Sequence, residues 1–145
     1  MSCTFSQLRA AVATKVAGVS GFKLTRFPPG YFARMQNTIA HKAFLVNLRS
    51  SQDAPERQRR AGIYLNTTVE VEFAFRLRPK DVYPTDYDTA LNAEEDVIRA
   101  VLSSYNGVQP GVEIRYNRSS RQVVDTLEYQ IHNIEFTARH VLPNT

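Results

Sequence analysis

The residues able to do acid, base, nucleophile or metal chemistry are few and widely separated in this sequence. The three histidines are His41, His132 and His140, and none has an acidic residue at a spacing typical of a catalytic or metal-binding pair. Cys3 has no nearby histidine that could activate its thiol as a nucleophile. No nucleotide-binding, zinc-protease or serine-hydrolase motif occurs. The sequence therefore predicts no catalytic residue, no cofactor and no metal site, with a metal site assembled only by folding as the alternative.

One stretch of the chain is strongly acidic. Between residues 81 and 96 it carries carboxylates with no lysine or arginine among them: Asp81, Asp86, Asp88, Glu94, Glu95 and Asp96. Paired carboxylates can bind Mg²⁺ or transfer protons. Acidic residues at the beginning of a helix also stabilise it through the helix dipole, and this is the role we expect here. The stretch could equally form one half of an interface.

Basic residues gather in two other segments. The polar segment 49–60 lacks apolar periodicity, which predicts a long charged loop. Its arginines are Arg49, Arg57, Arg59 and Arg60. Nearer the C-terminus, Arg115, Arg118 and Arg121 predict a weak surface for nucleic-acid phosphates. Sequence-specific recognition is not expected, because the nearby aromatic residues alternate into an apolar face and do not interleave with the basic ones.

The N-terminal half predicts one helix and several strands to position these residues. The helix is expected over 5–17, because Thr4 and Gln7 form a capping box and apolar residues then recur at helical spacing. Strands are expected over 22–27, over 43–48 and within 67–78. The last of these has the clearest pattern, because its apolar residues occupy alternate positions: Val69, Val71, Phe73, Phe75 and Leu77.

The C-terminal half predicts a helix over 88–102, a strand over 112–116, a turn at 117–120 and a last strand over 127–138. Asp86 or Asp88 is the expected cap of the helix. In the last strand the apolar positions change parity near His132 and Asn133. One extra residue at that point would restore the register, so the sequence predicts a β-bulge there.

Length and composition favour a single domain. The chain has 145 residues, of which 43% are hydrophobic, and this suffices for one core, so we expect residues 1–145 to form one domain. Because strands outnumber helices and follow one another, the predicted class is α+β, an antiparallel or mixed sheet flanked by two main helices with a long charged loop. The sequence shows no membrane-spanning run and no secretory leader, which predicts an intracellular protein without membrane contact.

The order of these segments resembles that of the tail terminator, or tail completion, proteins of long-tailed bacteriophages and phage-like particles. The matching pieces are the opening helix, the strand 43–48 with the charged segment after it, the strand 69–75, the acidic segment 86–91 and the terminal strand 127–136. The resemblance spans nearly the whole chain. It lies in the order of the elements, because no invariant motif defines that family.

This resemblance implies a virion structural protein without catalytic residues, assembled in the host cytoplasm and located in the tail or neck. It implies a ring of identical subunits, a hexamer, that caps the finished tail tube and provides the surface for head attachment. The implied partners are the tail tube protein and a head–tail connector or stopper protein. The alternatives are another neck component, such as a connector or stopper, or a small intracellular enzyme with a dispersed active site.

Segments of opposite charge suit head-to-tail association, which forms a closed ring when the rotation between subunits permits. The sequence therefore predicts that Arg57, Arg59 and Arg60 of one subunit contact acidic residues of its neighbour: Asp86, Asp88, Glu94 and Glu95. Pairing within one chain is the alternative. Six bodies of this size would surround an opening on the order of 30 Å, and DNA passing through it would make non-specific contacts with a basic lumen.

Overall fold

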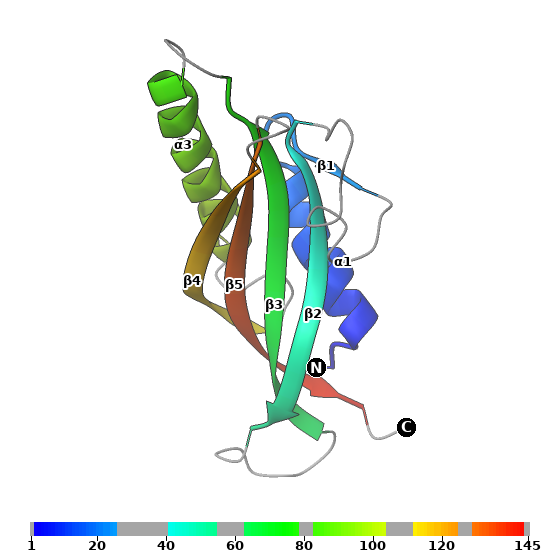
Figure 1. Ribbon diagram of the computed structural model, residues 1–145. Coiled ribbons are helices and arrows are strands. Elements are labelled where there is room, and N and C mark those ends of the chain that lie inside the picture. The colour runs from blue at the N-terminus through cyan, green and yellow to red at the C-terminus, as the bar shows by residue number, and fades with distance from the viewer. Residues whose placement is uncertain are drawn as a thin grey trace.

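The computed structural model describes residues 2–25, 41–54, 63–78, 83–103, 112–124 and 129–143. In chain order these form α1 (Phe5–Ala17), β1 (Lys23–Leu24), β2 (Ala43–Asp53), β3 (Ile63–Arg76), α3 (Tyr83–Leu102), β4 (Glu113–Val124) and β5 (Tyr129–Leu142) (Figure 1). The sheet has the order β1-β2-β3-β5-β4, with β1 parallel to β2 and the other neighbours antiparallel. The predicted α+β class, with a mixed sheet and two main helices, is therefore confirmed.

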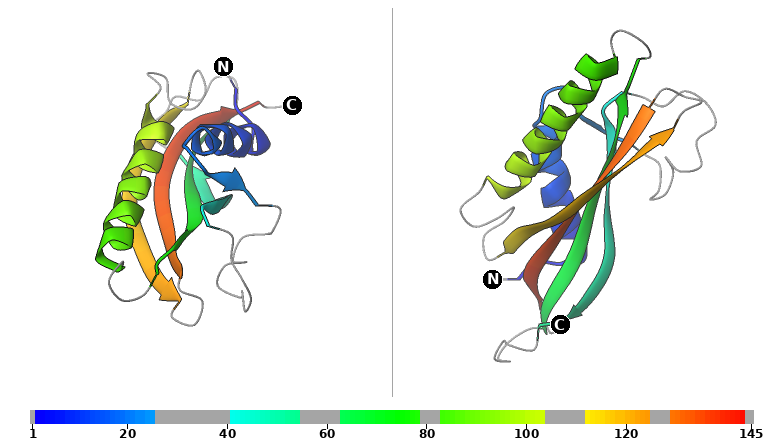
Figure 2. Two further views of the ribbon diagram at one scale, coloured as in Figure 1. Left: turned by 90° about the horizontal axis from the view of Figure 1, so that it is seen from above. Right: turned by 60° about the vertical axis from the view of Figure 1, so that its left-hand side comes forward.

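Both helices pack against the same face of the sheet, called here the helix face (Figure 2). They contribute these residues to the core: Leu8, Val12, Val16, Ala90, Ala93, Val97 and Val101. The alternating apolar residues of segment 69–77 are almost fully buried in the same core, as the sequence predicts. The opposite side of the sheet, called the outer face, carries the intervening residues of each strand. Neither helix in the described part of the chain is both long and apolar enough to cross a bilayer.

The first helix has the bounds and the cap that the sequence predicts. The Gln7 backbone N–H donates to Thr4 Oγ1 at 3.2 Å, and the Thr4 N–H donates to Gln7 Oε1 at 2.9 Å. Just before the helix, the Cys3 N–H donates to the Val141 carbonyl at 2.7 Å. This bond joins the segments near the two ends of the chain, which lie at the same end of the sheet (Figure 1).

The strand β2 is longer than the sequence predicts. The charged segment expected as a loop over 49–60 continues the ladder as far as Asp53, with Ser51 opposite Thr67 and Asp53 opposite Leu65. The prediction is wrong for residues 49–53, because polar residues can occupy a strand wherever a neighbouring strand pairs with their backbone. Residues 55–60, the rest of that segment, lie outside the described residues.

The turn expected at 117–120 is wrong, because β4 continues through it to Val124. Ser119 and Ser120 pair with β5, and the register shifts between Tyr116 and Arg118. The extra residue is Asn117, so a β-bulge exists in this hairpin but on the other strand from the one expected.

The bulge expected near His132 is also wrong, because β5 pairs with β3 in unbroken register from Tyr129 to Leu142. The parity change has another cause. Tyr129 and Ile131 are buried on the outer face, where Ile131 lies opposite buried Ala74 and the next row of the sheet contains buried Leu45. At this end of the sheet both faces are apolar, so the two parities belong to two buried surfaces.

The second helix, α3, begins at Tyr83, five residues before the start expected from the sequence. Pro84 lies in its first turn, where the missing backbone N–H has no intrahelical partner to lose. Asp86 is therefore inside the helix and not its cap. The segment 22–27, expected as a strand, contributes only Lys23–Leu24 to β1, and residues 26–27 lie outside the described residues.

Candidate functional site

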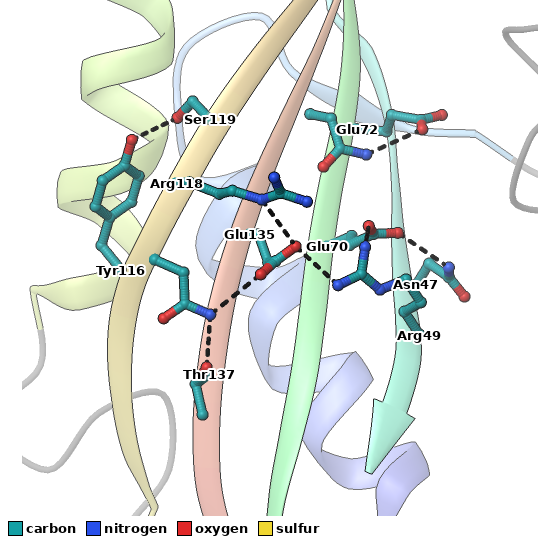
Figure 3. A network of polar contacts seen from close by, with 11 residues as sticks. Asn47, Arg49, Glu70, Glu72, Tyr116, Arg118, Ser119, Glu135 and Thr137 are labelled. Atoms are coloured by element: carbon teal, nitrogen blue, oxygen red, sulfur yellow. Dashed lines mark hydrogen bonds and ion pairs between the residues drawn. The ribbon is translucent and has the colours of Figure 1, made fainter.

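A network of polar side chains crosses four neighbouring strands on the outer face (Figure 3). Glu70 of β3 lies directly opposite Glu135 of β5, and two carboxylates in that position repel each other. Arg49 of β2 bridges them: its Nη1 donates to Glu70 at 3.1 Å and its Nη2 to Glu135 at 3.0 Å. Arg118 of β4 adds an ion pair from Nε to Glu135 at 3.4 Å. The guanidinium of Arg49 therefore compensates a repulsion that the strand register creates.

The two arginines lie above the two carboxylates. The side chains of Glu70 and Glu135 are 14% and 13% exposed, whereas those of Arg49 and Arg118 are 47% and 70% exposed. The acidic groups are thus recessed against the sheet, and the basic groups face outward. The charged groups most accessible to solvent or to a partner on this face are therefore the guanidiniums of Arg49 and Arg118.

The side-chain amides of Asn117 and Asn133 also belong to this network. Asn117, the bulge residue, donates from Nδ2 to Thr137 Oγ1 at 2.6 Å and to Glu135 at 3.3 Å. Asn133 donates to Glu72 Oε2 at 3.2 Å. Burial raises the pKa of Glu72, and the nearby charge of Glu70 acts in the same direction, while the Asn133 hydrogen bond opposes them. An open depression of about 420 Å³ lies over this region.

A second charged cluster lies on the helix face and is buried. Glu94 of α3 accepts hydrogen bonds from Arg121 of β4, at 2.9 Å from Nε and 2.6 Å from Nη2. It also accepts one from His132 Nδ1 of β5 at 2.6 Å. Burial by itself would raise the pKa of Glu94, but the hydrogen bonds from His132 and Arg121 outweigh it, and the pKa is lowered. The Glu94 carboxylate therefore links α3 to β4 and β5 through hydrogen bonds.

A histidine beside a carboxylate is the arrangement of many general bases, so the surroundings of His132 decide its role. Its ring stacks on Phe73 with centroids 4.5 Å apart and planes 8° apart, and the residue has no exposed surface. Its Nε2, the atom that would take a proton, is buried and has no hydrogen-bond partner among the described residues. No substrate can reach that atom in this conformation, so the cluster is a structural one.

The third histidine and the cysteine also have structural positions. His140 Nδ1 donates to the Cys3 carbonyl at 2.9 Å, which leaves Nε2 to accept from the Thr67 hydroxyl at 2.7 Å. Ser51, which is exposed, extends this chain to the surface through a 2.8 Å contact with Thr67. Burial raises the pKa of the Cys3 thiol, which keeps it protonated and unreactive. Among the residues that the structure describes, no group of three or more histidine, cysteine or acidic residues could hold a metal ion.

The structure separates the acidic residues predicted to contact a neighbouring subunit. Asp86 is buried and paired within the chain: it accepts from the Arg78 backbone N–H at 2.8 Å and from Arg78 Nε and Nη2 at 2.9 and 2.8 Å. These hydrogen bonds lower the pKa of Asp86 to about 2. Glu94 is buried as described above. Asp88 and Glu95 are exposed, and Glu95 pairs with Arg99 at 3.0 Å along the helix.

The predicted basic residues are also placed in different surroundings. Arg115 and Arg118 lie on the outer face, opposite Thr137 and Glu135, whereas Arg121 lies on the helix face opposite His132. The reversal comes from the bulge at Asn117, which shifts the parity of everything after it. Arg57, Arg59 and Arg60 lie outside the described residues.

Sequence reasoning missed the centre of the outer-face network, because Arg49, Glu70 and Glu135 come together only through strand pairing. The alternation of Glu70 and Glu72 with buried residues indicates a solvated strand face and nothing more. Only the register puts Glu70 opposite Glu135. The need for a bridging cation follows from that register and from no local pattern.

Comparison with known proteins gives a structural match but no sequence match. No family model matches the chain, and neither does any curated protein sequence. A chain from the solved structure described as "Virion of native gene transfer agent (GTA) particle" superposes with a TM-score of 0.63, covering 92% of this chain and 94% of that one. The two chains share one fold. At 17% identity the likeness concerns the fold alone.

Proposed function

We propose that this chain is a structural protein of a phage-like virion, and specifically a tail terminator that forms a ring on the end of the tail tube. The observation that carries the proposal is the match along nearly the full length of both chains to a component of a gene transfer agent virion. The order of segments, which resembles that of tail terminators, supports the narrower role. The histidine that most resembles a general base is enclosed in the core, which favours a structural role over a catalytic one.

The proposed ring is homomeric, a hexamer, and lies between the tail tube protein and a head–tail connector or stopper protein. We propose that the basic segment containing Arg57, Arg59 and Arg60 contacts the acidic face of α3 in the neighbouring subunit. Because Asp86 and Glu94 are buried and paired inside the chain, the contact narrows to the exposed carboxylates, Asp88 and Glu95.

A mass measurement with and without tail tubes tests this function. The purified protein, alone and mixed with tubes of the tail tube protein, is measured by light scattering and imaged by electron microscopy. A tail terminator forms closed rings at tube ends and stops further tube growth. Binding to portal–connector complexes with no effect on tubes would assign the chain to a connector or stopper. A specific enzymatic activity abolished by one substitution at His132 or Asp86 would overturn the structural role.

A further inference from the structure

We propose that His140 is a proton-binding site inside the folded protein, which takes up and releases a proton through the hydroxyl groups of Thr67 and Ser51. The imidazole of His140 and the side chain of Thr67 have no exposed surface, whereas Ser51 is exposed. These three side chains form an unbroken hydrogen-bonded chain from the solvent to the core. Because this site lies within one chain, it does not depend on the proposed ring.

The bond to the N-terminal segment fixes which ring nitrogen can take the proton. A backbone carbonyl only accepts hydrogen bonds, so the 2.9 Å contact with the Cys3 carbonyl requires a hydrogen on His140 Nδ1. In the neutral ring the other nitrogen, Nε2, then has a free electron pair. This Nε2 atom lies 2.7 Å from Thr67 Oγ1. The basic atom of His140 is therefore the one at the inner end of the hydroxyl chain.

Both hydroxyl groups can reverse their hydrogen bonds, because a hydroxyl donates and accepts. With the ring neutral, Thr67 donates to Nε2 and accepts from Ser51. For uptake, a proton from water binds to Ser51 Oγ, Ser51 passes its own proton to Thr67, and Thr67 passes its own proton to Nε2. Each hydroxyl ends with one hydrogen, so only the ring gains a proton and a positive charge. Afterwards Nε2 donates to Thr67, Thr67 donates to Ser51 and Ser51 donates to water, so no buried group loses its partner.

The groups that face His140 favour a proton held by hydrogen bonds over one held by an opposite charge. Phe5 of α1 contacts the ring in an edge-to-face arrangement with centroids 5.5 Å apart, and Leu65 of β3 lies opposite it in the sheet. The Cys3 thiol, whose pKa burial raises, is uncharged. On β2, Asp53 lies in the same row beyond Leu65, about 10 Å away and exposed to the screening of water. The charge of the protonated ring is therefore stabilised by its two hydrogen-bond acceptors, through charge-assisted bonds.

His132 provides a comparison within the same molecule, because it is equally buried but lacks such a chain. Its Nε2 is buried and has no hydrogen-bond partner in the described part of the protein. A proton on that atom would be a buried donor without an acceptor, which costs about 1–3 kcal/mol. A hydroxyl route to water thus exists for the Nε2 of His140 and, among the described residues, not for that of His132.

Nuclear magnetic resonance of the full-length protein with isotope-labelled histidine tests the proposal. The ring nitrogen signals of His140 are followed from about pH 8 down to the onset of unfolding, which the backbone amide spectrum reports. We expect the wild-type Nε2 signal to move towards that of a protonated ring while the amide spectrum stays that of the folded protein. Thr67→Val, which has the same shape without the hydroxyl, should keep the neutral signal over the same range. Thr67→Ser, the matched control, keeps the hydroxyl and should behave as the wild type does.

Ser51→Ala separates the route from the acceptor, because it leaves Thr67 in place and changes only an exposed side chain. Its two protonation states should exchange more slowly than those of the wild type, so that the averaged His140 signal broadens or splits. Exchange as fast as in the wild type would overturn the proposed route. The proposal also fails if the wild-type signal does not move before the folded amide spectrum is lost, or if Thr67→Val behaves as the wild type. A folded Thr67→Ser protein that keeps the neutral signal would overturn it too, because the methyl group of Thr67 would then be the cause.

Discussion

At the scale of single residues, the buried Glu94 decides how the second helix is attached. Its carboxylate receives three hydrogen bonds from Arg121 and His132, and the residue is 3% exposed. Hydrogen bonds to a charged group stabilise a fold by more than neutral ones do, and losing a partner leaves the others buried and unpaired. Glu94 is therefore a structural residue, although Glu95 and Asp96, the acidic residues that follow it, are exposed.

Replacing Glu94 with glutamine should destabilise the protein while preserving its shape. The amide oxygen can replace Oε1, which accepts from Arg121 Nε and His132, but the amide nitrogen would then face the Arg121 Nη2 donor and the negative charge would be lost. We therefore expect the free energy of unfolding to fall by about 1–3 kcal/mol. Urea denaturation followed by circular dichroism measures this. The adjacent variant Glu95→Gln loses only an exposed pair with Arg99, so it should stay within about 0.5 kcal/mol of wild type. Equal effects of the two variants would contradict the role given to Glu94.

Asp86 makes a prediction about acid stability. Its pKa is lowered to about 2 because Arg78 hydrogen-bonds to the ionised form. A group whose pKa is lower in the folded state stabilises the fold above its unfolded pKa, which is near 3.9, and this stabilisation disappears as the pH falls towards 2. Urea midpoints measured from pH 5 to pH 2 should therefore fall for the wild type. The Asp86→Asn variant should start lower and fall less within that window.

If the Asp86→Asn variant lost as much stability as the wild type between pH 4 and pH 2, the Arg78 contact would not be the cause. Other carboxylates, Glu94 among them, also titrate in acid. The test is therefore the difference in urea midpoint between the wild type and the Asp86→Asn variant at each pH, and not the pH dependence of one protein alone.

At the scale of elements, the sequence predicts what local patterns encode and fails where pairing overrides them. The capping box of α1 and the alternation in β3 are local, and both are confirmed. The segment 117–120 has the composition of a turn, yet its backbone pairs with β5. Turn propensity is weak beside the hydrogen bonds of a long ladder. The bulge at Asn117 could not be predicted from a change in the apolar pattern, because Arg118 and Ser120, which follow it on the outer face, are both polar.

Prediction of the candidate site from the sequence fails for the same reason as prediction of the turn at 117–120. The sequence indicates solvated strand positions for Glu70 and Glu135, whereas it predicts a loop at Arg49 and a turn at Arg118, and contact between all four depends on register. Arg118 and Arg121 are three residues apart and were expected on one surface, whereas the structure places them on opposite faces of the sheet. A charge pattern along one strand cannot reveal which of its residues meet the next strand.

The cap of α1 allows a direct test of a local interaction. Replacing Thr4 with alanine removes the hydroxyl that accepts from the Gln7 N–H, and we expect a loss of about 1 kcal/mol in the free energy of unfolding. Thr4→Ser keeps the hydroxyl and should retain most of that stability. Thermal melting of the two variants beside the wild type measures the difference. A serine variant as unstable as the alanine variant would mean that the methyl group, and not the cap, matters.

At the scale of the whole molecule, exposed groups of opposite charge lie on different sides of the sheet. The two lie on different sides: the exposed carboxylates are on α3, which packs on the helix face, and the arginines are on the outer face. The acidic half of the proposed lateral contact therefore does not use the outer face.

The proposed closure of the ring gives the last prediction. Reversing three charges, Arg57→Glu, Arg59→Glu and Arg60→Glu, should weaken assembly, because each would then repel Asp88 and Glu95 of the neighbouring subunit. Exposed ion pairs contribute only about 0–1 kcal/mol each and are screened by salt, so the effect needs all three and should be largest at low salt. Adding Asp88→Arg and Glu95→Arg should restore assembly, whereas Glu94→Arg would not, since Glu94 is buried. Light scattering gives the mass of each variant, and circular dichroism checks its fold.

A control with the same charge change at exposed residues elsewhere, Lys23→Glu, Arg76→Glu and Arg115→Glu, should assemble normally. Normal assembly of the first triple variant at low salt would eliminate this contact.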